Sequence, residues 1–344
     1  MAQQMEDIHE YKDRIIVKEN LILKVFTIGY KTMGESIVIL ILADDIVRFS
    51  AVIDCYEVEE CNLTLKILNE YSIKDTIDLI CMTHPDKDHC KGLNKVLQKA
   101  NKNTMILYPY HLFDDFCYDE DVKKSVLKIS EYGLKNKNNT NVPRLKPCAD
   151  NLSIPINIKF INSTNQNIYP LEISTYSPVS EIIERPWARN YQERNYSHKN
   201  SHNNLSIMLS IALGNFKTLF CGDIENDSIN IVQRNLNEID KLFFSKIIHV
   251  LKIPHHGSKE SDKIFQLIDG TEISNSITTT YTSKNLPNES IINKYKSKSE
   301  KLYCTSDIYE EKNNVYNYGV VETTMDIFKQ TLRVENKKYD EIEL

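Results

Sequence analysis

The densest group of chemically capable side chains lies in residues 81–92, which read CysMetThrHisProAspLysAspHisCysLysGly. After an apolar, strand-like run, four of six consecutive positions there carry ligand-type side chains: His84, Asp86, Asp88 and His89. Imidazole nitrogens bind borderline divalent metals, and carboxylates add negative charge and can orient a bound water. A solvated turn with helix-capping aspartates is the plain alternative. Two histidines and two aspartates packed this densely favour a metal site.

Two further segments also end an apolar run in polar, ligand-type side chains. Residues 218–225 read ThrLeuPheCysGlyAspIleGlu and place Asp223 in a GlyAsp turn. Residues 253–258 read IleProHisHisGlySer and contain the adjacent His255 and His256. Either feature would be unremarkable by itself. Because all three clusters follow strand-like runs, we expect them to meet on one rim of the fold and to form one metal centre.

The segments around these clusters alternate between strand and helix patterns. Short apolar runs predict strands at residues 21–28, 36–42, 46–53, 77–82, 104–108, 205–213, 217–221, 247–253, 276–281 and 301–305. Apolar residues at helical spacing predict helices at 63–71, 90–101, 224–236, 261–268 and after Pro287. This alternation favours a mixed α/β fold in which two sheets pack face to face with helices outside.

Regular patterning is thinner between residues 110 and 200. One helix pattern at residues 122–129 is followed by two polar runs. We interpret about 110–200 as an insertion within a single domain spanning 21–344, and residues 1–20 as a polar lead-in. The insertion is where we expect contacts with a partner protein or with further copies of the chain.

The order HisXAspXAspHis, GlyAsp and HisHisGlySer resembles the metallo-β-lactamase superfamily. The third-position Asp of the first motif, together with LysXXHisHisGlySer, is similar to the hydrolase domain of ComEC-type DNA-uptake proteins. LysValPheThrIleGly…GlyGluSerIleValIle (24–39) resembles the family's opening strands, and AlaValIleAspCys (51–55) its strand ending in Asp. The resemblance covers roughly residues 21–310 and implies an α/β fold, the four-layer αββα metallo-β-lactamase sandwich.

Carried over position by position, the resemblance implies two divalent metal ions, zinc or manganese. His84 and Asp86 would bind the first ion, and Asp88 and His89 the second. Asp223 would bridge the two ions. The resemblance therefore implies a dinuclear site.

Other positions would surround this set. His255 would complete the second metal site, and His256 would face the substrate or product and act in catalysis with Asp88. Asp54 would orient a ligand histidine by a hydrogen bond, or else is simply an Asp in a strand-end turn. Many relatives carry another histidine before the GlyAsp motif. His202 is the candidate here, although ComEC-type domains have none at that point.

The stretch from residue 185 to residue 202 mixes cations with aromatic rings: Arg185, Arg189, Arg194, Lys199, Trp187, Tyr191 and Tyr196. Arginine can hold phosphates while aromatic rings stack bases. With the carboxylate-rich site, this stretch favours nucleic acid or a nucleotide as substrate. Lys252 and Ser258 of the histidine motif are further candidates for substrate contacts. The stretch is equally consistent with a solvated loop, or with an oligomer contact anchored by Trp187.

We therefore expect a metal-dependent hydrolase, a phosphodiesterase or nuclease in which a hydroxide bound to the metals attacks the substrate. Hydrolysis of another bond, such as a lactone, thioester or peptide in a bacterial defence or stress system, stays open. So does an inactive binding or regulatory module, although the intact ligand set argues against it. The chain has no GxSxG, GxxxxGK[ST] or GxGxxG motif, which removes support for serine-nucleophile, nucleotide-driven and dinucleotide functions.

The composition sets the expected cellular context. Of the 344 residues, 41% are hydrophobic, enough for a sizeable core, and the net charge of −6 excludes a global positive field for nucleic acid. The 8 cysteines include no CxxC pair, which favours buried thiols in a reducing compartment. The N-terminus lacks the apolar core of a signal peptide, and the longest apolar run, 37–43, is too short to cross a bilayer. We expect a cytoplasmic protein without membrane association.

Overall fold

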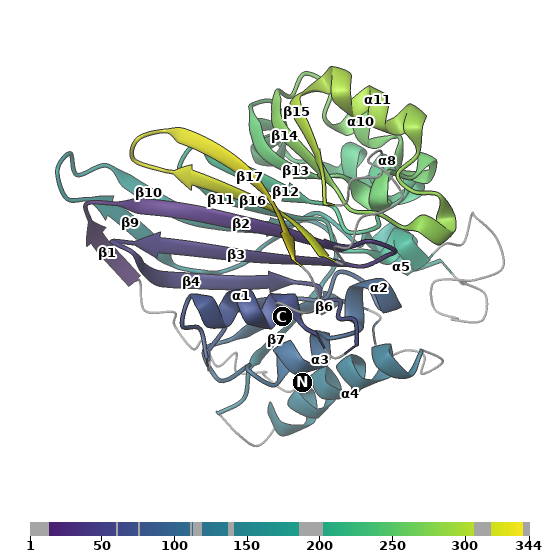
Figure 1. Cartoon of the computed structure of the whole chain (residues 1–344), viewed down its shortest axis with the longest axis horizontal. Coiled ribbons are helices and arrows are strands. Elements are labelled where there is room, and N and C mark those ends of the chain that lie inside the picture. The colour runs from purple at the N-terminus through teal and green to yellow at the C-terminus, as the bar shows by residue number, and fades with distance from the viewer. Residues whose placement is uncertain are drawn as a thin grey trace, which may run out of the picture.

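The computed structural model describes residues 14–59, 61–74, 76–110, 112, 119–136, 141–185, 202–305 and 318–339. Within them the chain is a mixed α/β structure built on two β-sheets (Figure 1). The first sheet has the order β17-β16-β2-β3-β4-β5-β6-β7. Its strands are Leu21–Tyr30 (β2), Glu35–Ala43 (β3), Ile46–Ile53 (β4), Leu79–Cys81 (β5), Met105–Pro109 (β6), Arg144–Cys148 (β7), Tyr318–Asp326 (β16) and Thr331–Tyr339 (β17).

The second sheet has the order β1-β9-β10-β11-β12-β13-β14-β15, with β8 beside β10. Its strands are Arg14–Lys18 (β1), Leu152–Ser153 (β8), Ile158–Asn162 (β9), Ile168–Thr175 (β10), Leu209–Leu213 (β11), Phe216–Phe220 (β12), Ile248–Lys252 (β13), Ile273–Thr278 (β14) and Ser299–Cys304 (β15). The α-helices are Leu63–Glu70 (α1), Lys87–Cys90 (α2), Leu93–Leu97 (α3), Glu120–Asn136 (α4), Ser180–Ile183 (α5), Asn226–Asn235 (α8), Glu238–Phe244 (α9), Ile264–Leu267 (α10) and Glu289–Lys298 (α11).

Strand β3 explains why the central strands are apolar throughout. Ile37, Ile39 and Ile41 join a core to which both sheets contribute side chains. The alternate residues of β3 pack instead with the apolar sides of α1, α3 and α4. Because successive side chains point to opposite faces, a strand covered on both faces must be apolar at every position. The two expected sheets and their shared core are therefore present.

The second sheet is also covered on both faces. In β12, Phe220 packs into the core shared by the sheets, whereas Leu219 packs with residues of α8, α10 and α11. Figure 1 shows α1 to α4 gathered on one side of the molecule, and α8, α10 and α11 on the opposite side. The helices of the first half of the chain thus pack on one sheet, and those of the second half on the other.

Most predicted elements around the metal motif are confirmed. The strands expected at 21–28, 36–42 and 46–53 are β2, β3 and β4. The helices expected from Leu63 and after Pro287 are α1 and α11. These elements carry the strongest apolar periodicity, which is why the sequence predicts them well.

Two regions differ from the prediction. Residues 144–175, interpreted as part of an insertion with little regular structure, contribute β7 to one sheet and β8 to β10 to the other. Residues 14–18, interpreted as part of a polar lead-in, form β1 and pair in parallel with β9. Strands β1, β7 and β9 lie at or next to a sheet edge, where exposed side chains weaken the apolar pattern.

Glu322 of β16 ties three neighbouring strands together. Its side chain is only 4% exposed, and Lys24 of β2 donates a hydrogen bond to it over 2.6 Å. Lys337 of β17 donates to its other carboxylate oxygen. Burial raises the pKa of Glu322, but these two lysines outweigh burial and hold the pKa below its ordinary value.

Among the residues described, no helix combines the length and the hydropathy required to span a bilayer.

Candidate metal centre

The predicted ligand clusters lie at the carboxyl ends of parallel strands. Asp54 directly follows β4, which pairs in parallel with β5, and the HisXAspXAspHis motif follows β5. In the second sheet Asp223 follows β12, and His255 follows its parallel neighbour β13. The carboxyl ends of parallel strands are where α/β folds place their sites. The prediction that the three clusters share one rim is confirmed, because His256 from one sheet reaches Asp88 from the other at 3.1 Å.

The local backbone turns the two adjacent histidines into the site. His255 and His256 both have a left-handed conformation, with φ of 45° and 50°. Bulky residues adopt this region at a cost of about 1–3 kcal/mol each, and they keep it only where the surroundings over-determine it. Strain at two consecutive histidines therefore points to a functional requirement at this turn.

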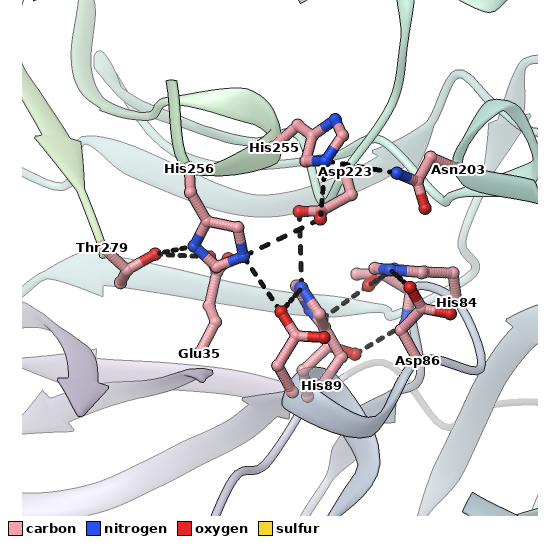
Figure 2. A network of polar contacts seen from close by, with 12 residues as sticks. Glu35, His84, Asp86, His89, Asn203, Asp223, His255, His256 and Thr279 are labelled. Carbon is pink, nitrogen blue, oxygen red and sulfur yellow. Dashed lines mark hydrogen bonds and ion pairs between the residues drawn. The ribbon is translucent and has the colours of Figure 1, made fainter. Parts of the chain in front are cut away.

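A buried cluster of Glu35, His89, Asp223 and His256 could hold a metal ion, because one ligand atom of each lies within 4.8 Å of the others. Figure 2 shows these side chains converging from the two sheets. Asp88 belongs to the same group, since its Oδ2 lies 3.1 Å from His256 Nε2 and 3.6 Å from His89 Nε2. All of these side chains are buried.

Asp223 occupies the middle of the group. Its Oδ1 lies 3.3 Å from His89 Nε2, while its Oδ2 lies 3.7 Å from His256 Nε2 and 3.8 Å from His255 Nε2. Although both are buried, neither Asp223 Oδ1 nor His89 Nε2 makes a hydrogen bond within the described part of the chain. Buried polar atoms are normally satisfied. Two facing atoms that can both bind a metal, and that lack hydrogen bonds, fit a metal ion bound by both.

The first half of the predicted dinuclear site adjoins this group. His84 Nε2 lies 3.6 Å from Asp86 Oδ2, and the rings of His84 and His89 are 4.2 Å apart. The His84 side chain is fully buried, whereas 27% of the Asp86 side chain is exposed. The structure thus brings together all the ligand residues that the sequence predicts.

Asp54 orients two of these histidines, as predicted for one. Its carboxylate accepts hydrogen bonds from Thr83 N at 2.7 Å and Thr83 Oγ1 at 2.5 Å, and it lies 2.8 Å from His89 Nδ1. Thr83 Oγ1 is also 3.1 Å from His84 Nδ1. Because the single hydroxyl proton goes to Asp54, the Thr83 oxygen accepts from His84. Both rings therefore turn their Nε2 atoms toward the site.

Sequence reasoning missed the partners of His255. Glu225 Oε1 lies 3.3 Å from His255 Nδ1, on the side of the ring away from Asp223. Asn203 Nδ2 donates to Glu225 Oε1 over 3.1 Å and lies 3.3 Å from His255 Nε2. Glu225 stands two positions after Asp223, so the GlyAspIleGlu segment held a signal. Asn203 lies far away in the sequence and gave none.

The electrostatics of the cluster favour a cation. Burial disfavours the charged form of His89, yet the surrounding carboxylates, Asp223 first, outweigh burial and hold its pKa well above the ordinary value. Burial raises the pKa of Asp223, but the neighbouring histidines, His256 first, outweigh it and hold this pKa well below the ordinary value. The buried carboxylates therefore stabilise positive charge at this point of the structure. A divalent ion would supply the same positive charge.

Two predicted residues have other surroundings than expected. His256, expected to face the substrate, turns Nε2 toward Asp88 and Asp223 instead. Lys252, expected to contact the substrate, is fully buried and lies 2.5 Å from the carboxylate of Glu35. The buried ammonium of Lys252 cannot reach a substrate without breaking its ion pair with Glu35. Both corrections follow from Glu35, which the sequence did not connect with the histidine motif.

The remaining substrate candidates make other contacts or lie outside the described residues. Ser258 accepts a hydrogen bond from Glu260 N and so caps a short turn. Arg185 pairs with Asp227 at 3.0 Å. His202 begins a 3₁₀ turn, but its side chain is outside what the structure describes. The other three candidates fall entirely outside the described residues: Trp187, Arg189 and Arg194.

No family model and no curated protein matches the sequence. The metal-binding chemistry of the cluster therefore follows from its potential ligand atoms. Histidine nitrogens and carboxylate oxygens supply them, and burial raises the pKa of the nearby Cys90 thiol well above its ordinary value. A buried set of nitrogen and oxygen donors without a thiolate suits a divalent metal ion.

Proposed function

We propose that this chain is a dinuclear metal-dependent phosphodiesterase or nuclease with the four-layer metallo-β-lactamase arrangement. Support for the fold comes from two sheets that share a core and carry helices on their outer faces. The observation that carries the function is the pair of buried atoms His89 Nε2 and Asp223 Oδ1. They lie 3.3 Å apart, and neither makes a hydrogen bond within the described residues.

In this proposal the residues divide between two adjacent ions. His84 and Asp86 would hold one ion, while Asp88 and His89 would hold the other. Asp223 would lie between the two ions, since it is buried in the middle of the cluster with its Oδ1 3.3 Å from His89 Nε2.

His255 and His256 complete the donor set from the second sheet, and Asp88 is the ligand we expect to be indispensable for turnover. Divalent ions at this site would make a nucleophilic water available at neutral pH and stabilise the negative charge of the transition state.

The surroundings of His256 favour an anionic substrate with aromatic groups. The Tyr281 ring packs edge-on against His256, with ring centroids 5.6 Å apart, and Tyr56 packs near Tyr30 at 6.3 Å. Each tyrosine carries a lysine whose Nζ lies 4.8–6.0 Å from the ring centroid. We call this group the Tyr–Lys surface: Tyr30, Lys31, Tyr56, Lys91, Tyr281 and Lys284. Lys31 and Lys284 are exposed and can hold phosphates, and the partly exposed Tyr30 and Tyr281 can stack bases, whereas Tyr56 is buried beneath them in support. This surface therefore suits a nucleotide strand.

The test is hydrolysis of bis-p-nitrophenyl phosphate and of single-stranded DNA, with and without added Mn²⁺ or Zn²⁺. A lactone, a thioester and a β-lactam are run in parallel. We expect metal-dependent turnover of the phosphodiesters, lost in Asp223→Ala. The matched control is Asp227→Ala, which removes a partly exposed aspartate four positions along the chain. Turnover confined to another bond type would overturn the phosphodiesterase assignment while leaving the metal centre in place.

A further inference from the structure

A series of buried side chains in mutual contact begins at His256 Nδ1, on the side of the ring away from the other ligands. His256 Nδ1 lies 2.7 Å from Thr279 Oγ1, and Thr279 Oγ1 donates to Glu35 Oε2 over 3.0 Å. Glu35 Oε2 lies 2.5 Å from Lys252 Nζ. Figure 2 shows Thr279 and Glu35 beside His256, with Asp223 across the ring. The residues come from β3, β13 and the ends of β13 and β14, so the series joins both sheets.

The directions of these hydrogen bonds follow from proton counting. Glu35 Oε2 forms an ion pair with Lys252 Nζ and accepts the hydrogen bond of the Thr279 hydroxyl. Thr279 has one hydroxyl proton, which it gives to Glu35. Its oxygen must therefore accept a proton from His256 Nδ1. His256 is thereby fixed with a proton on Nδ1 and with Nε2 toward Asp88 and Asp223.

The same arrangement occurs behind the first motif. There Asp54 accepts from the Thr83 hydroxyl, and the Thr83 oxygen accepts from His84. Both threonines are buried and both stand just after a strand that ends at the site. A carboxylate–threonine–histidine relay thus contacts one histidine from each sheet, His84 from the first and His256 from the second.

We infer that Glu35 is a positioning residue that acts through Thr279 to orient His256 as a metal ligand, and that Lys252 holds the Glu35 carboxylate in place by an ion pair. The inference rests on the proposed metal site. Within the candidate cluster it removes Glu35 from the direct ligands, because its Oε2 already meets Lys252 and Thr279. An ion binding that oxygen would compete with an ammonium 2.5 Å away, which repulsion between like charges opposes.

The experiment measures the affinity of the full chain for Zn²⁺ by competition with a chromophoric chelator. Thr279→Val removes the hydroxyl but keeps the branched shape, and we expect affinity to fall about 10–100-fold, the usual cost of losing an outer-shell partner. Thr279→Ser keeps a hydroxyl and should restore most of the affinity. The matched control is Thr278→Val, whose hydroxyl donates to a backbone carbonyl rather than toward the site.

A second set of variants separates a relay from a direct ligand. Glu35→Gln leaves Lys252 buried beside a neutral partner, so it is combined with Lys252→Met to keep the interior uncharged. If Glu35 acts through Thr279, adding this pair to Thr279→Val causes little further loss, because the effects share one path. If Glu35 binds the ion directly, the combined variant loses much more affinity than Thr279→Val alone.

The outcomes are distinct. Zn²⁺ binding by the native chain, with loss in Thr279→Val and rescue in Thr279→Ser, supports the relay. Native affinity in Thr279→Val, or equal loss in Thr278→Val, overturns the relay but leaves the proposed metal centre standing. Failure of the native chain to bind Zn²⁺ or Mn²⁺ overturns both.

Discussion

Replacing Asp54 with Asn tests the network that holds the metal ligands in place. Asp54 is fully buried and its carboxylate meets the backbone and hydroxyl of Thr83 and the Nδ1 atom of His89. Its backbone is left-handed, with φ of 55°. Asn tolerates that conformation as Asp does, so the change removes the negative charge and one acceptor while keeping the turn.

The expected loss can be worked out from these contacts. Removing one outer-shell partner of a metal ligand costs about 10–100-fold in metal affinity or activity. Asp54 supports His89 directly and His84 through Thr83, so we expect the upper end of that range. A loss of about 100-fold corresponds to about 2.8 kcal/mol, at 1.4 kcal/mol per tenfold.

The assay is Zn²⁺ affinity and phosphodiester turnover, measured on Asp54→Asn and on Asp44→Asn as a matched control. Asp44 is also left-handed, with φ of 48°, and accepts backbone hydrogen bonds, but it lies at the β3–β4 turn, at the opposite end of β4 from Asp54. The control should keep native affinity. If Asp54→Asn keeps it too, the orienting role assigned to Asp54 is refuted.

Three further expectations follow from other parts of the structure. Asp88→Ala should abolish turnover, by about 10³-fold or more, with a circular dichroism spectrum like that of the native chain; retained activity would mean that the reacting centre lies elsewhere. Glu322→Gln should lower the urea midpoint at pH 7, and its difference from the native chain should shrink as the pH falls below about 4. The folded pKa of Glu322 is depressed, so its contribution to stability is present above the unfolded pKa of about 4.3 and is lost as pH falls through the folded pKa. A gap between the two urea midpoints that persists at low pH would contradict this. Lys31→Glu combined with Lys284→Glu should weaken single-stranded DNA cleavage more than bis-p-nitrophenyl phosphate hydrolysis, since both lysines are exposed and a strand brings several phosphates where the small substrate has one; equal effects would remove the Tyr–Lys surface from substrate binding.

The sequence predicted which side chains come together in the cluster because they sit in short motifs after apolar strands. His84, Asp86, Asp88 and His89 are local to one turn, and a single pattern reveals them. Glu35 lies on β3, and only the meeting of the two sheets brings it near the histidine motif. Thr279 is likewise one of several threonines in a row, and nothing local separates it from its neighbours. Hydrogen-bonded residues on strands that are distant in the sequence, such as Glu35 and Thr279, form no recognisable spacing in the sequence.

The strands of residues 144–175 were missed for a different reason. In β9, Ile158 and Phe160 are buried while Lys159 between them is exposed, so the alternation spans only a few residues. In β10, Pro170 and several polar residues interrupt the pattern. Such strands are fixed by pairing with their neighbours more than by their own composition. The well-predicted β3, by contrast, is apolar at almost every position because both of its faces are covered.

The measurement that tests the central claim most directly is the metal content of the purified native chain, by elemental analysis, before and after incubation with Zn²⁺ or Mn²⁺ and removal of excess ion. The account predicts about two ions per chain, as expected for a dinuclear hydrolase. In a variant combining His89→Ala with Asp223→Ala, it predicts a large loss. No bound metal in the native chain under either condition would contradict it.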